Sequence, residues 1–492
     1  MDSPLNRRAS GVLLHPSSLP CSSSPHGNFG EDAYRFIDFL AHAGFHYWQI
    51  LPTGPTDCSN SPYQSSSAFA GNSLFISLDE VAEISLLNTK LTQAVSKKEH
   101  HQLLKQAFST FQSKPSAQLL EEFESFCQTE KYWLDGYASF CAIKNHHDQK
   151  PWYEWPTDLR QRKPSALREA HEKFNNEILF YHFEQWLYDR QWQALSRYAK
   201  ERDIEIIGDV AIFVAHDSAD VWEHQGLFDL DESGQAIHVA GVPPDYFSET
   251  GQRWGNPLYN WPALEASNFK WWKQRIGHIL KHVSLVRIDH FRGFEACWEI
   301  LAEEKTAING HWKKAPGKVF FEALSQDYSP LPIIAEDLGI ITPEVEALRD
   351  QFKLPGMEIL QFAFDSDSKN PYLPHNHTKN SVAFTGTHDN NTSLGWYNSL
   401  PESVQKTFFE YLAHPSQSMP WPIIQSALAS VSQLAIIPFQ DLLALDKEHR
   451  MNTPGTTEGN WQWRFDWEEL PLNLTERCRH LNNMYDRNSS TD

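Results

Sequence analysis

Eight short apolar runs, each ending in a polar or glycine-containing turn, constrain the fold of this chain more than any other feature. The apolar residues within each run are nearly continuous, whereas a strand with one face in water would alternate apolar and polar residues. Helix-like segments such as AYRFIDFLAHAG and PEVEALRDQF separate most of the runs. This alternation predicts an α/β fold, a (β/α)8 TIM barrel of buried parallel strands, with an open doubly wound sheet as the alternative. The runs begin at Gly11, Tyr47, Ile204, Ser284, Pro332, Met357, Ser381 and Leu434.

Two long connections interrupt this regular order. Residues 81–202 hold helical patterns such as AQLLEEFESFCQ, separated by polar breaks that contain proline. They predict a helical subdomain inserted between the second and third strands, so that residues 1–80 and 203–492 together form the catalytic barrel. Residues 217–272 include GVPPDYFSETGQRWGNPLYNW, whose proline, glycine and aromatic content predicts an irregular loop over the barrel mouth.

Charge and composition argue against several classes of partner. The chain has 42 basic and 63 acidic residues, and a net charge of −21 repels nucleic acid and anionic membranes. There is no apolar run of about 18 residues to span a bilayer, and the N-terminal run is too short for a signal peptide. Six cysteines without CxxC spacing predict a reduced, cytoplasmic protein without a zinc site. No protein partner is implied, whereas 30 Phe, 16 Tyr and 18 Trp favour a carbohydrate ligand.

Acidic residues end most of the predicted strands. Chemistry in such barrels lies at the carboxyl ends of the strands, so these side chains are expected to meet at one mouth. Arg287 and Asp289 share one face of a strand, so the arginine would pair with the carboxylate and aim it, as a nucleophile requires. Only one of the neighbours Glu336 and Asp337 can face the mouth, and the glutamate has the reach of a proton donor. The strand-end residues are Asp209, Asp289, Glu336, Asp337, His388, Asp389 and Asp441, the last interpreted as a helix cap.

Two chemistries fit this set of residues. Glycosyl transfer or hydrolysis needs an acid and a nucleophile on either side of the bond, with further groups that hold sugar hydroxyls. A metal-assisted hydrolase would instead use Asp and His ligands. The positive charge of Arg287 opposes a bound cation, which favours carbohydrate chemistry. A third interpretation is that the carboxylates are structural caps and ion pairs. The histidines that could serve as ligands are His15, His216, His290 and His388.

Several long motifs resemble those of one family. The segments RIDHFRGFEACWEI, IIAEDLGIITPEVEALRD, FTGTHDNNTSLGWY, GDVAIFVAHDSADVW, GVPPDYFSETGQRWGNPLYNW and SPYQSSSAFAGNSL look like those of the 4-α-glucanotransferases. These are the amylomaltases or disproportionating enzymes, relatives of the α-amylases. The resemblance runs from Gly11 to Phe465. It implies transfer between α-1,4-glucans by a retaining double displacement, without metal or organic cofactor. A hydrolase of the same clan is the alternative.

The resemblance also implies roles for four of the strand-end residues. Asp289 would attack the anomeric carbon, and Glu336 would protonate the leaving oxygen and then deprotonate the acceptor. Asp389, together with His388, would hold hydroxyls of the sugar at the cleavage point and favour its distorted form. A catalytically silent glucan-binding protein is disfavoured, because a binder needs no paired acid and nucleophile.

Further residues are implied in substrate binding. The loop Asp245-Tyr246-Phe247, with Trp254, would form a lid over the acceptor site and keep water from the intermediate. Asn452 would contact glucan, although a structural role fits it equally. The substrate-binding residues implied by matching motifs are Arg287, His388, Asp209, Tyr63, Tyr246, Phe247, Trp254 and Asn452.

Two positions depart from the pattern of the family. Asp57-Cys58-Ser59-Asn60 stands where the family often has Gly-Tyr-Gly-Asp, so the tyrosine of an accessory glucan site is missing. Ala211 replaces a usual proline, which is expected to loosen that turn without touching the chemistry. The implied substrates are maltooligosaccharides, amylose, glycogen-derived dextrins and glucose.

Overall fold

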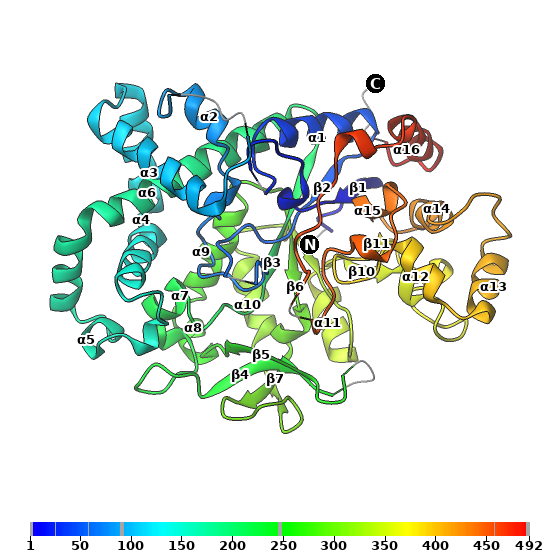
Figure 1. The fold of residues 1–492 in the computed structure, drawn as a ribbon. Coiled ribbons are helices and arrows are strands. Elements are labelled where there is room, and N and C mark those ends of the chain that lie inside the picture. The colour runs from blue at the N-terminus through cyan, green and yellow to red at the C-terminus, as the bar shows by residue number, and fades with distance from the viewer. Residues whose placement is uncertain are drawn as a thin grey trace.

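A parallel sheet of eight strands forms the centre of the molecule (Figure 1). The computed structural model describes residues 3–24, 26–57, 59–88, 93–244, 248–456 and 458–488. The strand order is β10-β11-β12-β1-β2-β3-β6-β9, and each strand overlaps one of the eight predicted runs. The barrel prediction is therefore confirmed. The strands are β1 (Ala9–Leu13), β2 (Tyr47–Gln49), β3 (Glu205–Ala211), β6 (Leu285–Asp289), β9 (Ile333–Ala335), β10 (Gly356–Ile359), β11 (Ser381–Phe384) and β12 (Leu434–Pro438).

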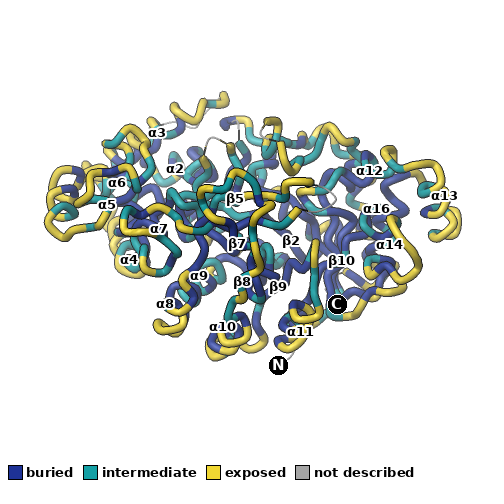
Figure 2. Tube along the Cα trace, turned by 90° about the horizontal axis from the view of Figure 1, so that it is seen from below, coloured by how far each residue is buried: buried dark blue, intermediate teal, exposed yellow. Residues whose placement is uncertain are grey.

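Both faces of these strands are buried, which is why their sequences are nearly continuous apolar runs. On β6, Val286 and Ile288 belong to the apolar layer between sheet and helices, whereas Leu285 belongs to a separate cluster inside the barrel. Arg287 and Asp289 follow Leu285 at two-residue steps on that inner face. The inner face of β6 thus changes from apolar to charged toward the barrel mouth. Figure 2 shows the strands as a buried centre within exposed outer helix faces.

The barrel is nearly closed between β9 and β10. These strands form no regular ladder, but Ala335 N–H donates to Pro355 O at 2.9 Å. The Asp337 carboxylate accepts the Met357 N–H at 2.8 Å and also pairs with Arg349. A Cβ atom at Gly356 would lie 2.4 Å from that carboxylate. The side chain of Asp337 therefore fills the space between β9 and β10, which we call the seam, and residue 356 must be a glycine to leave room for it.

Helices cover the outside of the barrel, with one exception. Between β10 and β11, residues 360–380 form only short 3-10 turns and no α-helix. Every helix in the described part of the chain is either too short or too polar to span a lipid bilayer. The helices are α1 (Glu31–His42), α2 (Leu78–Glu83), α3 (Lys97–Ser113), α4 (Ala117–His146), α5 (Thr157–Arg160), α6 (Pro164–Lys200), α7 (Ala219–Glu223), α8 (Trp261–Ala266), α9 (Lys270–Ile279), α10 (Gly317–Leu324), α11 (Pro343–Gln351), α12 (Ser393–Ser399), α13 (Glu402–Tyr411), α14 (Trp421–Ala429), α15 (Phe439–Leu442) and α16 (Leu474–Met484).

The connection between β2 and β3 is helical and lies on one side of the barrel (Figure 1). Its long helices α4 and α6 pack against each other. Gln185 on α6 exchanges two hydrogen bonds of 2.8 Å with the backbone of Gly71, and Tyr188 donates to Thr53. Helix α6 therefore holds the loop that follows β2. The division into a barrel and an inserted subdomain at residues 81–202 stays a prediction.

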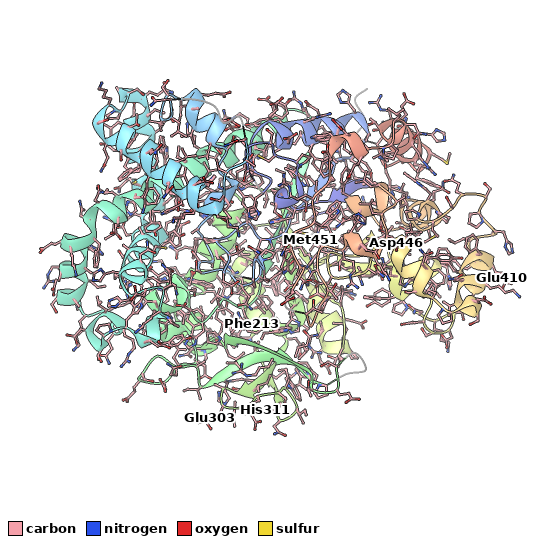
Figure 3. All side chains as sticks on the ribbon, in the orientation of Figure 1. Phe213, Glu303, His311, Glu410, Asp446 and Met451 are labelled. Atoms are coloured by element: carbon pink, nitrogen blue, oxygen red, sulfur yellow. The ribbon has the colours of Figure 1, made fainter. Side chains whose placement is uncertain are left out.

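A second sheet lies at one side of the barrel, where an irregular loop was predicted for residues 217–272. Strands β4 (His238–Val242) and β5 (Gln252–Pro257) pair with β7 (Ala296–Leu301) and β8 (His311–Lys314) in the antiparallel order β5-β4-β7-β8. We call this the side sheet. The prediction of irregular structure is wrong there, because the partner strand β7 belongs to a later connection and leaves no local signal. Glu303 and His311 mark the outer end of the side sheet in Figure 3.

Candidate active site

Arg287 is the centre of a charged cluster at the barrel mouth. It is buried on the inner face of β6, directly opposite Asp209 on the neighbouring strand β3. Its Nη1 donates to both carboxylate oxygens of Asp209, at 2.9 and 2.7 Å, and its Nη2 donates to Asp289 Oδ1 at 2.9 Å. One guanidinium therefore fixes two carboxylates, which is the charge-assisted geometry that arginine provides best.

The electrostatics of this cluster depend on its burial. Burial alone would lower the pKa of Arg287, but Asp209 and Asp289 together raise it well above the usual value. Burial raises the pKa of Asp209, and Arg287 opposes that rise. The side chain of Asp209 is inaccessible to solvent, whereas 31% of the Asp289 side chain is exposed. Asp289 is thus the carboxylate of the pair that a ligand can reach.

Tyr63 closes one side of the cluster. Its hydroxyl donates to Asp209 Oδ2 at 2.8 Å, and burial and then the charge of Asp209 raise its pKa well above the usual value. The ring stacks on His388, with centroids 5.3 Å apart and planes 15° apart. Because α6 holds the loop after β2, the helical connection between β2 and β3 supports the position of Tyr63.

Glu336 lies next to Asp289 because β6 and β9 are neighbours. Its Oε2 accepts the His290 N–H at 2.6 Å, and its Oε1 accepts the Leu338 N–H at 2.9 Å. His290 adopts a left-handed conformation, with φ 53°, that turns the chain at the end of β6. Phe291 N–H donates to Glu336 O at 3.0 Å. The backbone on both sides therefore fixes the orientation of the Glu336 carboxyl group.

The environment of Glu336 suits a proton donor. Burial first, and the charge of Asp289 second, raise the pKa of Glu336 to about 8, although Arg287 and the two N–H donors oppose the rise. A carboxyl group with such a pKa is largely protonated at neutral pH. Asp337 points the other way, into the seam between β9 and β10, as the strand alternation predicted.

Asp389 and His388 lie on the loop after β11. Asp389 Oδ1 accepts a hydrogen bond from Asn452 Nδ2 at 2.6 Å, and 48% of its side chain is exposed. Asn452 N–H donates to His388 O at 3.2 Å, and Arg450 Nη2 donates to Asp389 O at 2.8 Å. The contact of Asn452 is therefore with Asp389, so a positioning role explains this residue without a direct contact to glucan.

Trp254 contributes an aromatic wall from the side sheet. It lies on β5, and its ring meets the His290 ring edge to face, with centroids 4.8 Å apart. The centroid of the Phe213 ring lies 6.4 Å from that of Trp254. The expected lid residues Tyr246 and Phe247, the neighbouring Asp245, and Cys58 lie outside the described residues.

Two residues at this mouth were missed by the sequence analysis. The Trp461 ring lies 6.0 Å from the Tyr63 ring and 5.8 Å from the His388 ring, and Arg450 holds the backbone of Asp389. The aromatic segment NWQW after Asn452 was the available signal for Trp461. Asp441 accepts hydrogen bonds from Ser393 N–H at the start of α12 and from the hydroxyl of Thr385, as expected of a cap.

The position of Arg287 argues against the metal-hydrolase interpretation. Arg287 occupies the space between the carboxylates of Asp209 and Asp289, where a cation would need to bind. Among the described residues, the one group of side chains with metal-ligand spacing lies on and beside the side sheet and also contacts Lys313, 2.7 Å from Glu299. That group consists of Asp229, His238 and Glu299.

Comparisons with known proteins agree with this geometry. The 4-alpha-glucanotransferase family, glycoside hydrolase family 77, matches residues 14–470. The 4-alpha-glucanotransferase of Thermus thermophilus is 48% identical over 492 residues, covering 96% of this chain and 98% of that protein. The Synechocystis enzyme of the same name is 47% identical over 501 residues, covering 98% and 99%. The structure of amylomaltase from Streptococcus agalactiae in complex with acarbose has a TM-score of 0.94 at 37% identity, covering 98% of this chain and 100% of that one.

The family match covers most of the chain, and the relatives are similar over nearly their whole length. The resemblance inferred from the motifs is therefore confirmed. With a matching barrel and a buried acid beside an arginine-paired carboxylate, the chain belongs to the 4-alpha-glucanotransferase family and is an enzyme of that activity on α-1,4-glucans.

Proposed function

We propose that this enzyme transfers α-1,4-glucan segments by a retaining double displacement with Asp289 as the nucleophile and Glu336 as the acid and base. The observation that carries the proposal is the contrast between two adjacent carboxyl groups. Asp289 is partly exposed and paired with Arg287, whereas Glu336 is buried with its pKa raised to about 8. A nucleophile and a proton donor on adjacent strands are what this chemistry requires.

In the first step an oxygen of Asp289 attacks the anomeric carbon of the donor. The glycosidic C–O bond breaks, and the proton of Glu336 moves to the departing 4-oxygen. A glycosyl ester on Asp289 results, and Glu336 is left as a carboxylate. In the second step the 4-hydroxyl of an acceptor attacks the same carbon and gives its proton to Glu336, and the bond to Asp289 breaks. Two inversions restore the α configuration.

The remaining residues hold the sugar at the cleavage point. Asp389 is exposed and oriented by Asn452, so its free oxygen can accept a hydroxyl hydrogen bond. The rings of Tyr63, His388 and Trp461 form an aromatic cluster beside it. Such surfaces stack on the apolar faces of sugar rings. The complex of a relative with acarbose supports an oligosaccharide-like ligand for this enzyme.

We propose maltooligosaccharides, amylose and glycogen-derived dextrins as donors, with glucose as the smallest acceptor. Maltotriose alone is expected to give glucose together with a ladder of longer maltooligosaccharides, because a sugar hydroxyl replaces water as the acceptor. Chromatography of the products over time measures this. Products that only become shorter, with reducing ends rising in step, would show that water is the main acceptor.

The pH dependence of the reaction tests the role of Glu336. Glu336 must be protonated to assist a sugar leaving group, so kcat/KM for maltotriose is expected to fall about tenfold per pH unit above about pH 8. Fluoride leaves without a proton, so the same decline is not expected with α-maltosyl fluoride as donor. Initial rates for both donors, measured from pH 5 to pH 10, give the comparison. An identical decline for both donors would assign it to another group.

We also propose that the protein works in a reducing compartment, the cytoplasm. The cysteines that the structure describes form no disulfide with one another. Burial raises the pKa of Cys141, Cys297 and Cys478 to about 12, so these thiols are poor nucleophiles for disulfide exchange.

A further inference from the structure

The side sheet reaches the acid and base Glu336 through one buried arginine. Arg292 lies in the 3-10 turn η5 (Phe291–Phe294), three residues after Asp289, and only 4% of it is exposed. Its Nη1 donates to Ile340 O. Ile340 belongs to the segment that follows Glu336. Arg292 therefore connects the chain after the nucleophile with the chain after the acid.

The two hydrogen bonds that orient the Glu336 carboxyl group come from residues close to this contact. One comes from His290 N–H, two residues before Arg292, and the other comes from Leu338 N–H, two residues before Ile340. The Leu338 amide lies in a segment that Asp337 fixes between β9 and β10 and that a contact with η5 holds at its other end. On the η5 side, Arg292 supplies that contact through Ile340 O.

Trp312 covers the arginine from the solvent side. It lies on β8, one of the two edge strands of the side sheet, and the Arg292 guanidinium lies 3.7 Å from the centre of its ring. Trp298 packs edge to face on Trp312, with centroids 5.2 Å apart. The end of β8 is tied to η5, since Lys314 pairs with Glu295 and Ala315 N–H donates to Glu295 O at 2.9 Å. A covered guanidinium binds a carbonyl more firmly than one in water.

We propose that Arg292, covered by Trp312, is a positioning residue that holds the loop after Glu336 and so aims its carboxyl group at the glycosidic oxygen. The side sheet then has a role in catalysis as well as in forming the wall that carries Trp254. This inference rests on the proposed function of Glu336 as acid and base.

The test compares Arg292→Met, Arg292→Lys and Trp312→Leu with the wild-type enzyme in maltotriose disproportionation. We expect Arg292→Met to lower kcat about tenfold with KM changed by less than about twofold, because a slightly misplaced proton donor costs rate rather than affinity. Arg292→Lys is expected to recover part of the rate, because an ammonium group can still donate to Ile340 O. The kcat of Trp312→Leu is expected to lie between those of Arg292→Met and the wild type.

The pH profile separates positioning from a loss of folded protein. The Leu338 N–H lowers the pKa of Glu336, so its withdrawal raises that pKa. The basic limb of kcat/KM is then expected to move about one pH unit upward in Arg292→Met. A variant that is only partly folded loses activity equally at every pH and keeps the limb where it is. The matched control is Lys313→Met, next to Trp312 on β8, which breaks an ion pair with Glu299 on β7 and is expected to leave the limb unchanged.

Two results would overturn the inference. One is a basic limb that does not move in either Arg292→Met or Trp312→Leu, whatever the loss of rate. The other is a shift of the same size in Lys313→Met. If Arg292→Met fails to fold, as judged by circular dichroism, the position of the basic limb in Trp312→Leu and Arg292→Lys tests the inference instead. Failure of the proposed function itself would look different: Glu336→Gln would then keep its activity on maltotriose and its basic limb.

Discussion

Replacing Asp289 by Asn is expected to lower kcat on maltotriose by about 10⁴-fold or more while the protein stays folded. The amide oxygen of the new side chain can still accept the hydrogen bond from Arg287 Nη2, so the cluster keeps its geometry. The amide is too weak a nucleophile to form the glycosyl ester, and removal of a catalytic nucleophile typically costs this much. Glucose release at saturating maltotriose gives the measurement.

A covalent trap makes this prediction specific to Asp289. A maltosyl fluoride with fluorine on the ring of its reacting sugar forms the ester quickly and loses it slowly. Wild-type enzyme treated with it is expected to gain one glycosyl mass, which peptide mapping places on Asp289, and Asp289→Asn is expected to gain none. Asp327→Asn, which changes an exposed carboxylate paired with Lys273, serves as the control and is expected to react like the wild type. A label on any other carboxylate would relocate the nucleophile.

Replacing Arg287 by Met is expected to remove activity and also to lower the free energy of unfolding by about 3–5 kcal/mol. The guanidinium is buried and holds Asp209 by two hydrogen bonds and Asp289 by one. Without it, the inaccessible Asp209 keeps one described hydrogen bond, from Tyr63, and an uncompensated charge. Unfolding in urea measures the loss, and maltotriose disproportionation measures the activity.

The pH dependence of this loss has a definite sign. Arg287 lowers the pKa of Asp209 against the effect of burial, so its removal raises that pKa further above the value in the unfolded chain. Asp209 in the variant can then be buried neutral at low pH but must be buried charged at high pH. The stability deficit of Arg287→Met is therefore expected to grow as the pH rises through the folded pKa.

A second substitution separates stability from catalysis. The double variant Arg287→Met/Asp209→Asn is expected to regain much of the lost stability, because the buried charge is gone. It is not expected to regain activity, because no guanidinium orients Asp289. An equal deficit in the single and double variants would show that packing of the arginine stem, and not the charge of Asp209, accounts for the loss.

The strands and the orientation of several strand-end side chains were predictable from local patterns. Continuous apolar runs located all eight barrel strands, because a strand that is buried on both faces has apolar residues at nearly every position. Two-residue spacing placed Arg287 beside Asp289, and the alternation of neighbours separated Glu336 from Asp337. These inferences need only the geometry of one strand.

The sequence by itself thus determined the barrel, its strand-end carboxylates and the family. Only the tertiary structure decided that Arg287 is shared with Asp209, that Tyr63 and Trp461 enclose His388, and that β4 and β5 pair with β7. It also decided that the Glu336 carboxyl group is buried beside Asp289, which raises its pKa to about 8. The physical reason is that the spacing of apolar and polar residues within one segment depends on how that segment itself is buried. Pairing between distant segments, and the loss of water that raises a pKa, depend on which other segments pack there.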